Sequence, residues 1–133
     1  MGSVSDITID THALLWYLDE DFNERLSNAA FEKIRTAEEH RRIYVPMIVL
    51  IETLACIEKG LFNLSFDKLL ESIERSETYE IVALDTEVLK LGVPIKGLSL
   101  HDRFILATAM RTDTVLVSRD RDILAKYGVH VVW

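Results

Sequence analysis

Hydrophobic positions follow two different spacings along the chain. Residues 7–9 alternate between apolar and polar and are β-branched, which predicts a short strand that ends at Asp10. From residue 11 to 18 the spacing becomes helical, with the leucines on one side. The same criteria predict strands at residues 43–45, 80–84, 114–117 and 129–132, and helices at residues 26–37, 47–59, 65–73, 87–91 and 99–109, with a short last helix ending at Tyr127.

Helix boundaries carry their own signals. Pro46 is acceptable as the first residue of the helix at 47–59, and Gly60 is a good residue to end it. Strands that alternate with helices predict an α/β fold, here a three-layer α/β/α sandwich around a mainly parallel sheet. The 133 residues suffice for one domain, residues 1–133. In such a fold the functional site lies at the carboxyl ends of the strands.

Composition narrows the class of protein. The chain is 49% hydrophobic and 28% charged, which is typical of a globular domain. The single cysteine, Cys56, excludes a disulfide framework and favours a reducing compartment, so we expect a cytoplasmic protein. No apolar run is long enough to span a bilayer, and residues 1–10 do not resemble a secretory signal, so no membrane association is expected.

The net charge argues against one kind of partner. Twenty-two acidic against 15 basic residues give a formal charge of −7. A protein that binds nucleic acid by charge alone is usually basic. That exclusion fails if several carboxylates are gathered around divalent cations, because bound metal inverts the local charge. The placement of the acidic residues therefore decides the question.

Four carboxylates occupy positions that a parallel sheet brings to one edge. Asp10 and Asp120 each follow a predicted strand, Asp102 lies in the first turn of the helix after Ser99, and Glu52 lies within the apolar stretch at 47–56. Four such groups together would repel one another strongly unless cations lie between them. Mg²⁺ and Mn²⁺ take carboxylate and water oxygens, and one or two such ions can activate water for phosphodiester cleavage.

Each carboxylate also has a purely structural interpretation. Asp10 is a good helix N-cap, Asp102 completes a capping box with Ser99, and Asp120 is a common type of turn residue. Glu52 is harder to explain in this way, because its neighbours are apolar and an unpaired buried carboxylate is costly. It needs a cation, a hydrogen-bonding partner or an exposed edge.

The motifs around these acids resemble those of one family. The segments 10–16 (DTHALLW), 45–52 (VPMIVLIE), 100–109 (LHDRFILATA), 116–120 (LVSRD) and 127–133 (YGVHVVW) are similar, in this order, to the conserved blocks of PIN-domain proteins, in particular the VapC-type toxins of bacterial toxin–antitoxin pairs. The resemblance covers essentially the whole chain. It implies an α/β/α sandwich and a Mg²⁺- or Mn²⁺-dependent endoribonuclease that acts on RNA. A VapC-like toxin further implies a small antitoxin partner and a homodimer.

The resemblance also assigns roles to residues. It makes Asp10, Glu52, Asp102 and Asp120 the acidic quartet that binds metal and catalyses cleavage, with Ser118 where the family more often has Thr. Residues with supporting or alternative roles are Thr11, which could orient a carboxylate, Asp122 as an extra acid, and Arg103, Arg119 and Arg121, which either hold RNA phosphates or pair with the acids. His101 is interpreted as a surface histidine, because an all-oxygen site does not require imidazole.

Other functions compete with the ribonuclease toxin. A receiver-type phosphoacceptor domain also places Asp residues at strand ends and binds Mg²⁺, but it needs a lysine after its fifth strand, where this chain has Ser118-Arg119-Asp120. A PIN-like module that only binds RNA or protein would not need all four acids. A PIN nuclease that matures RNA without being a toxin stays open.

Overall fold

The computed structural model describes residues 5–120 and 125–133, and its centre is a five-stranded sheet. All strand pairs among these residues are parallel, and the strand order is β3-β2-β1-β4-β5. The strands are β1 (Ile7–Ile9), β2 (Ile43–Pro46), β3 (Tyr79–Val82), β4 (Val115–Val117) and β5 (Val131–Val132). The predicted parallel sheet is therefore confirmed.

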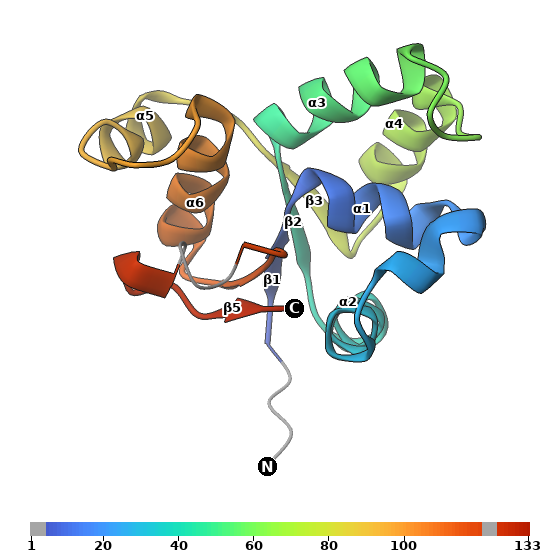
Figure 1. The fold of residues 1–133 in the computed structure, drawn as a ribbon, viewed down its shortest axis with the longest axis horizontal. Helices are drawn as coiled ribbons and strands as arrows, with labels where there is room; N and C mark the ends of the chain where they lie inside the picture. Colours follow the sequence, from blue (N-terminus) through green and yellow to red (C-terminus); the bar gives the residue numbers. More distant parts are fainter. Residues whose placement is uncertain (1–4, 121–124) are drawn as a thin grey trace.

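Helices cover both faces of the sheet (Figure 1). One side carries α1 (Thr11–Leu18), the 3₁₀ helix η1 (Glu20–Arg25), α2 (Asn28–His40), α3 (Met47–Glu58) and α4 (Phe66–Arg75). The other side carries α5 (Thr86–Gly92) and α6 (Leu100–Thr112), and a short 3₁₀ helix η2 (Ala125–Tyr127) precedes β5. This is the predicted α/β/α sandwich. Within the described residues, no helix combines the length and apolar character needed to cross a membrane.

The central strand β1 is more deeply buried than its alternating sequence suggests. Ile7, Thr8 and Ile9 are all fully buried, because β1 lies between β2 and β4 with helices on both faces. The hydroxyl of Thr8 is satisfied by those of Thr112 and Thr114, at 3.2 and 2.6 Å. A polar residue in a central strand is tolerated here because its hydrogen-bonding group has partners.

Several predicted boundaries shift by one to three residues. Pro46 is the last residue of β2 and caps α3, so the helix begins at Met47 and not at the proline. Leu26 lies outside α2, because that helix begins after its N-cap Ser27. The buried Leu26 side chain packs into the core from the end of η1. The last strand is confined to Val131–Val132.

The strand order decides between two of the competing functions. Strands β1 and β4 are neighbours in the sheet. From β1 the strand order continues outward through β2 to β3, and from β4 it continues in the opposite direction to β5. Receiver domains have the order 2-1-3-4-5, in which the first strand pairs with the second and third. The receiver interpretation is therefore wrong for this chain. The change of direction between β1 and β4 creates a switch point, where ligands bind in open α/β sheets.

Close packing of α5 against α6 sets the position of the start of α6. A Cβ atom added at Gly92 would lie 2.5 Å from Cε1 of Phe104, so the last turn of α5 can approach α6 only with glycine there. The guanidinium of Arg103 donates to the carbonyls of Gly92 and Val93 at 3.0 to 3.3 Å. These contacts tie the first turn of α6, which carries Asp102, to the end of α5.

Candidate active site

Asp10 lies at the carboxyl end of β1, at the switch point of the sheet. It is the N-cap of α1, and its carboxylate accepts from the backbone N–H of Ala13 at 2.9 Å. Its own backbone N–H donates to the carbonyl of Val117 at 3.2 Å, which joins the ends of β1 and β4. The structural interpretation as a cap is thus correct, and it leaves the remaining carboxylate lone pairs for other partners.

Burial raises the pKa of Asp10 to about 6. A hydrogen bond with the Ser118 side chain and the bond from Ala13 oppose this shift, and the negative charge of Asp102 adds to it. A carboxylate that is desolvated and faces a second carboxylate is costly to ionise, and such perturbed acids are typical of functional sites. The structure therefore brings Asp10, Ser118 and Asp102 together.

Asp102 combines two roles in the first turn of α6. Its backbone N–H donates to Oγ of the N-cap Ser99 at 3.2 Å. This bond confirms one half of the predicted capping box, the half in which the Ser99 side chain accepts from the backbone N–H of Asp102. No hydrogen bond to the Asp102 carboxylate occurs among the residues that the structure describes, and its charge acts on Asp10. Capping and a place in the site are therefore compatible.

Glu52 has polar contacts with two other helices. Its Oε1 accepts from the hydroxyl of Thr11 at 2.6 Å, and its Oε2 lies 2.9 Å from Nδ1 of His101. The Glu52 side chain is 25% exposed, and these two contacts give each oxygen of its half-buried carboxylate a polar neighbour. The interpretation of His101 as a plain surface histidine was incomplete. Its side chain is 55% exposed, but one ring nitrogen faces the site.

Asp120 stands apart from the other three acids. It is exposed, and its link to the site runs through the backbone, because its N–H donates to Oγ of Ser118 at 3.4 Å. Ser118 is buried and bonds both this N–H and Asp10. No contact joins the Asp120 carboxylate to Asp10, Glu52 or Asp102 in the described part of the chain. Arg121 and Asp122 lie outside the described residues.

The donor set suits a hard divalent cation in its chemistry. The ligands on offer are carboxylate oxygens at a strand-end switch point, where Asp10 and Asp102 repel each other and a positive ion would relieve the repulsion. Over residues 5–120 and 125–133, no three His, Cys, Asp or Glu side chains are placed closely enough to hold a metal together. Asp10 and Asp102 form the centre of the site, and Glu52 is attached to it through Thr11 and His101.

The predicted RNA-contacting arginines differ in their surroundings. Arg103 directs its guanidinium at the carbonyls that end α5, so its donors already have protein partners. Arg119 is exposed beside the site and lies over the ring of Trp16, 5.0 Å from the centroid, and Arg25 contacts the same ring system at 5.8 Å. Trp16 in turn packs edge-on against Trp133 at 5.9 Å. Arg25 and Arg119 thus both lie over the ring of Trp16.

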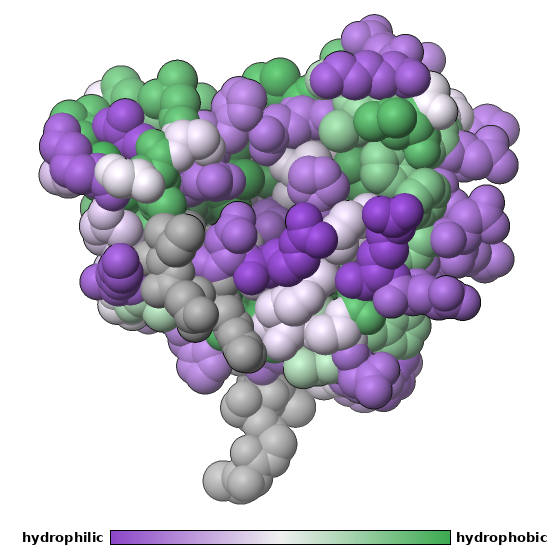
Figure 2. Space-filling model, viewed as in Figure 1, coloured by the Kyte–Doolittle hydropathy of each residue, from purple (hydrophilic) through white to green (hydrophobic). Residues whose placement is uncertain are grey.

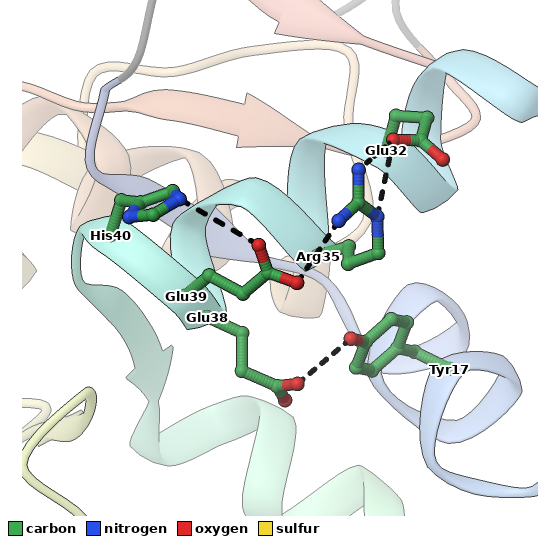
Figure 3. Close-up of polar contacts among 6 residues, drawn as sticks. All are labelled: Tyr17, Glu32, Arg35, Glu38, Glu39 and His40. Atoms are coloured by element: carbon green, nitrogen blue, oxygen red, sulfur yellow. Dashed lines mark hydrogen bonds and ion pairs between the residues drawn. The ribbon is translucent and has the colours of Figure 1, made fainter.

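Three further acids, Glu32, Glu38 and Glu39, have polar partners on the surface of α2 (Figure 3). Arg35 forms ion pairs with Glu32 at 2.5 Å and with Glu39 at 3.0 Å. These residues are three and four positions from Arg35, the spacing that brings side chains together on a helix surface. Glu38 accepts from the hydroxyls of Tyr17 and Tyr79 at 3.0 and 2.6 Å. The acidic excess is therefore divided between solvated helix surfaces and a small placed cluster at the strand ends.

The raised pKa of Asp10 predicts how the metal-free stability depends on pH. A folded-state pKa of about 6, against an ordinary value of 3.8 for an aspartate, means that the folded protein binds the proton more tightly than the unfolded chain. The contribution of Asp10 to stability is therefore fully present below about pH 4 and is lost as the pH rises through about 6. Asp10→Asn is expected to stabilise the metal-free protein above this range by on the order of 2–3 kcal/mol.

Urea unfolding in chelator at several pH values measures this difference. The gap between Asp10→Asn and the parent chain should grow from acid to neutral pH. A gap that stays constant over this range, or that closes, contradicts the assignment of the raised pKa to Asp10.

Comparisons with known proteins agree with this architecture. A sequence model of the PIN domain matches residues 7–129. The fold is similar to that of VapBC2 from Rickettsia felis, solved bound to a DNA fragment from their promoter, with a TM-score of 0.71, 11% identity, and coverage of 95% of this chain and 96% of that one. It is similar to FitAcB from Neisseria gonorrhoeae, with a TM-score of 0.65, 21% identity and coverage of 94% and 95%. It is also similar to FitAB bound to an IR36 DNA fragment, with a TM-score of 0.63, 21% identity, and coverage of 94% of this chain and 92% of that one. No curated protein matches the sequence.

Proposed function

Because this chain belongs to the PIN domain family, we propose that it is a Mg²⁺- or Mn²⁺-dependent endoribonuclease and the VapC-like toxin of a toxin–antitoxin pair. PIN domains are generally nucleases, and the match covers residues 7–129. The observation that carries the proposal is the pair Asp10 and Asp102 at the switch point, where burial and mutual repulsion raise the pKa of Asp10. Such a pair is an unfavourable arrangement for stability alone, which favours a functional reason for it.

The proposed site assigns distinct tasks to the residues. Asp10 and Asp102 would hold the ion, Glu52 would complete the carboxylate set, and Ser118 would orient Asp10 by its hydrogen bond. A bound divalent ion supplies charge stabilisation at the phosphate and an activated water. Asp120 enters this proposal as an outer acid, because it is exposed and joined to Ser118 only by its backbone. Arg119, beside the site and free of carboxylate partners among the described residues, is the better placed of the two described candidate arginines for an RNA phosphate.

The proposed partner is a small antitoxin. The solved relatives are named VapBC2, FitAcB and FitAB. A basic side chain of an antitoxin that enters the site would pair with Asp10 and Asp102 and compete with the ion for the same negative charge. The acidic balance of the chain, −7, favours such a basic partner segment.

We also propose a homodimer, and exposed apolar residues indicate where it forms. On α3, Met47, Ile51 and Leu54 are at least one-third exposed, and Leu89 and Val93 on or beside α5 are about half exposed. Figure 2 shows apolar surface over α3 and over α5 along the same upper edge of the molecule. Exposed apolar surface of this kind is typical of protein–protein interfaces.

The experiment that tests the proposed function is a cleavage assay with the purified chain. Structured and unstructured RNA, and DNA of the same sequence, are incubated with Mg²⁺, with Mn²⁺ and with EDTA. The proposal expects RNA cleavage that requires the metal. Cleavage without growth arrest on expression would favour a processing nuclease. No cleavage under any condition, together with unimpaired growth, would leave the noncatalytic PIN-like module as the better account.

A further inference from the structure

Glu52 is tied to both chain segments that carry the other two site acids. Thr11, which bonds Oε1 at 2.6 Å, directly follows Asp10, and His101, which lies 2.9 Å from Oε2, directly precedes Asp102. The three residues come from the starts of α1 and α6 and from within α3. The carboxylate of Glu52 is therefore held from two sides by the neighbours of Asp10 and Asp102.

The two contacts leave Glu52 able to bind something else. A carboxylate has about four acceptor positions, and the hydrogen bond from Thr11 and the contact with His101 engage one oxygen each. Nδ1 of His101 lies 2.9 Å from Oε2 of Glu52, and the His101 side chain is 55% exposed. A carboxylate fixed in this way loses little conformational freedom when a ligand arrives, because its rotamer is already chosen.

We propose that His101 is a positioning residue for Glu52: together with Thr11 it sets the carboxylate in the orientation that receives the divalent ion. The proposal rests on the metal site of the proposed function. It adds His101, which is not needed as a ligand in an all-oxygen site. His101 acts through Nδ1 and Glu52 and is not itself a ligand. Residues that orient metal ligands by hydrogen bonds commonly change metal affinity by about 10- to 100-fold when they are removed.

Matched substitutions separate this role from others. His101→Asn keeps an amide N–H near the position of Nδ1 and removes the rest of the ring, whereas His101→Leu removes the donor and keeps the bulk. Thr11→Ser keeps the hydroxyl, and Thr11→Val removes it with little change of shape. The His101 side chain is more than half exposed, so the two His101 variants are expected to fold like the parent chain.

The measurement is Mn²⁺ affinity at neutral pH, followed through the electron paramagnetic resonance signal of free Mn²⁺ and without any substrate. We expect His101→Leu and Thr11→Val to weaken Mn²⁺ binding by about 10- to 100-fold. His101→Asn and Thr11→Ser should stay within a few-fold of the parent chain. In a Glu52→Gln background, His101→Leu should have little further effect, because its contribution passes through the carboxylate.

Four results would overturn the inference. Equal affinity of His101→Leu and the parent chain would leave the contact without a role in metal binding. Tighter binding by His101→Leu would make His101 a competitor of the ion for Glu52. Equal losses in His101→Asn and His101→Leu would assign the effect to the imidazole itself. If the parent chain binds no Mn²⁺, the proposed metal site fails and this inference with it, a result that the parent chain alone reveals.

Discussion

Replacing Asp10 by Asn is expected to reduce RNA cleavage by at least about a hundredfold and to abolish growth arrest on expression in a bacterial host. The reason is geometric: cleavage of a phosphodiester needs an attacking water and an ion held in line with the scissile phosphate, and a misplacement of about 1 Å costs roughly a hundredfold in rate. Asp102→Asn should act similarly, because Asp102 faces Asp10 closely enough to raise its pKa.

A suitable control for this prediction is Asp67→Asn. Asp67 is an exposed acid in the first turn of α4, outside the site, so the same change of charge should leave cleavage and growth arrest intact. Circular dichroism and urea unfolding check that each variant is folded. If Asp10→Asn cleaves RNA as fast as the Asp67→Asn control, Asp10 has no part in catalysis and the proposed centre of the site is misplaced.

The second large effect is expected in thermal stability with and without metal. A ligand that binds only the folded state stabilises it by about 2.7 kcal/mol at a hundred times its Kd, which corresponds to a rise in Tm of roughly 10 °C for a chain of this size. Mg²⁺ or Mn²⁺ should produce this rise in the parent chain. Asp10→Asn, Glu52→Gln and Asp102→Asn should each reduce it.

Adding metal should also reverse which of two proteins, Asp10→Asn or the parent chain, is the more stable. Without metal at neutral pH, Asp10→Asn is expected to be more stable than the parent chain. Burial raises the pKa of Asp10, so its carboxylate is costly to ionise, and the variant carries a neutral amide in its place. With saturating metal the parent chain should be the more stable of the two. Thermal scans in EDTA and in Mn²⁺ measure both orders. An unchanged metal response in all three variants would contradict a shared site.

Local elements were predictable because their signals are short-range. The predicted helix starts at Ser65 and Ser99 are caps that each accept a hydrogen bond from the backbone N–H three residues on, as the capping rule requires. The apolar spacing of α4 and the β-branched run of β1 likewise depend on residues within a few positions. The parallel sheet followed from the alternation of these elements.

Burial and boundaries depended on neighbours that are distant in sequence. Thr8 is fully buried because β1 acquires strands on both sides and helices on both faces, which its own three-residue pattern does not contain. The exclusion of a receiver domain likewise required the observed strand order, since both folds place acids at strand ends.

The sequence by itself determined the fold class, the family resemblance and the identity of the four candidate acids, because strand ends and helix starts carry local signals. Only the tertiary structure separated those acids. It put Asp102 where its charge acts on Asp10, gave Glu52 its partners and left Asp120 exposed with a backbone link to Ser118. The bond between Thr11 and Glu52 joins residues 41 positions apart, and His101 reaches Glu52 from a third helix. Such contacts form when the packing of the helices on the sheet brings separate segments together, and no local pattern encodes which atoms then meet.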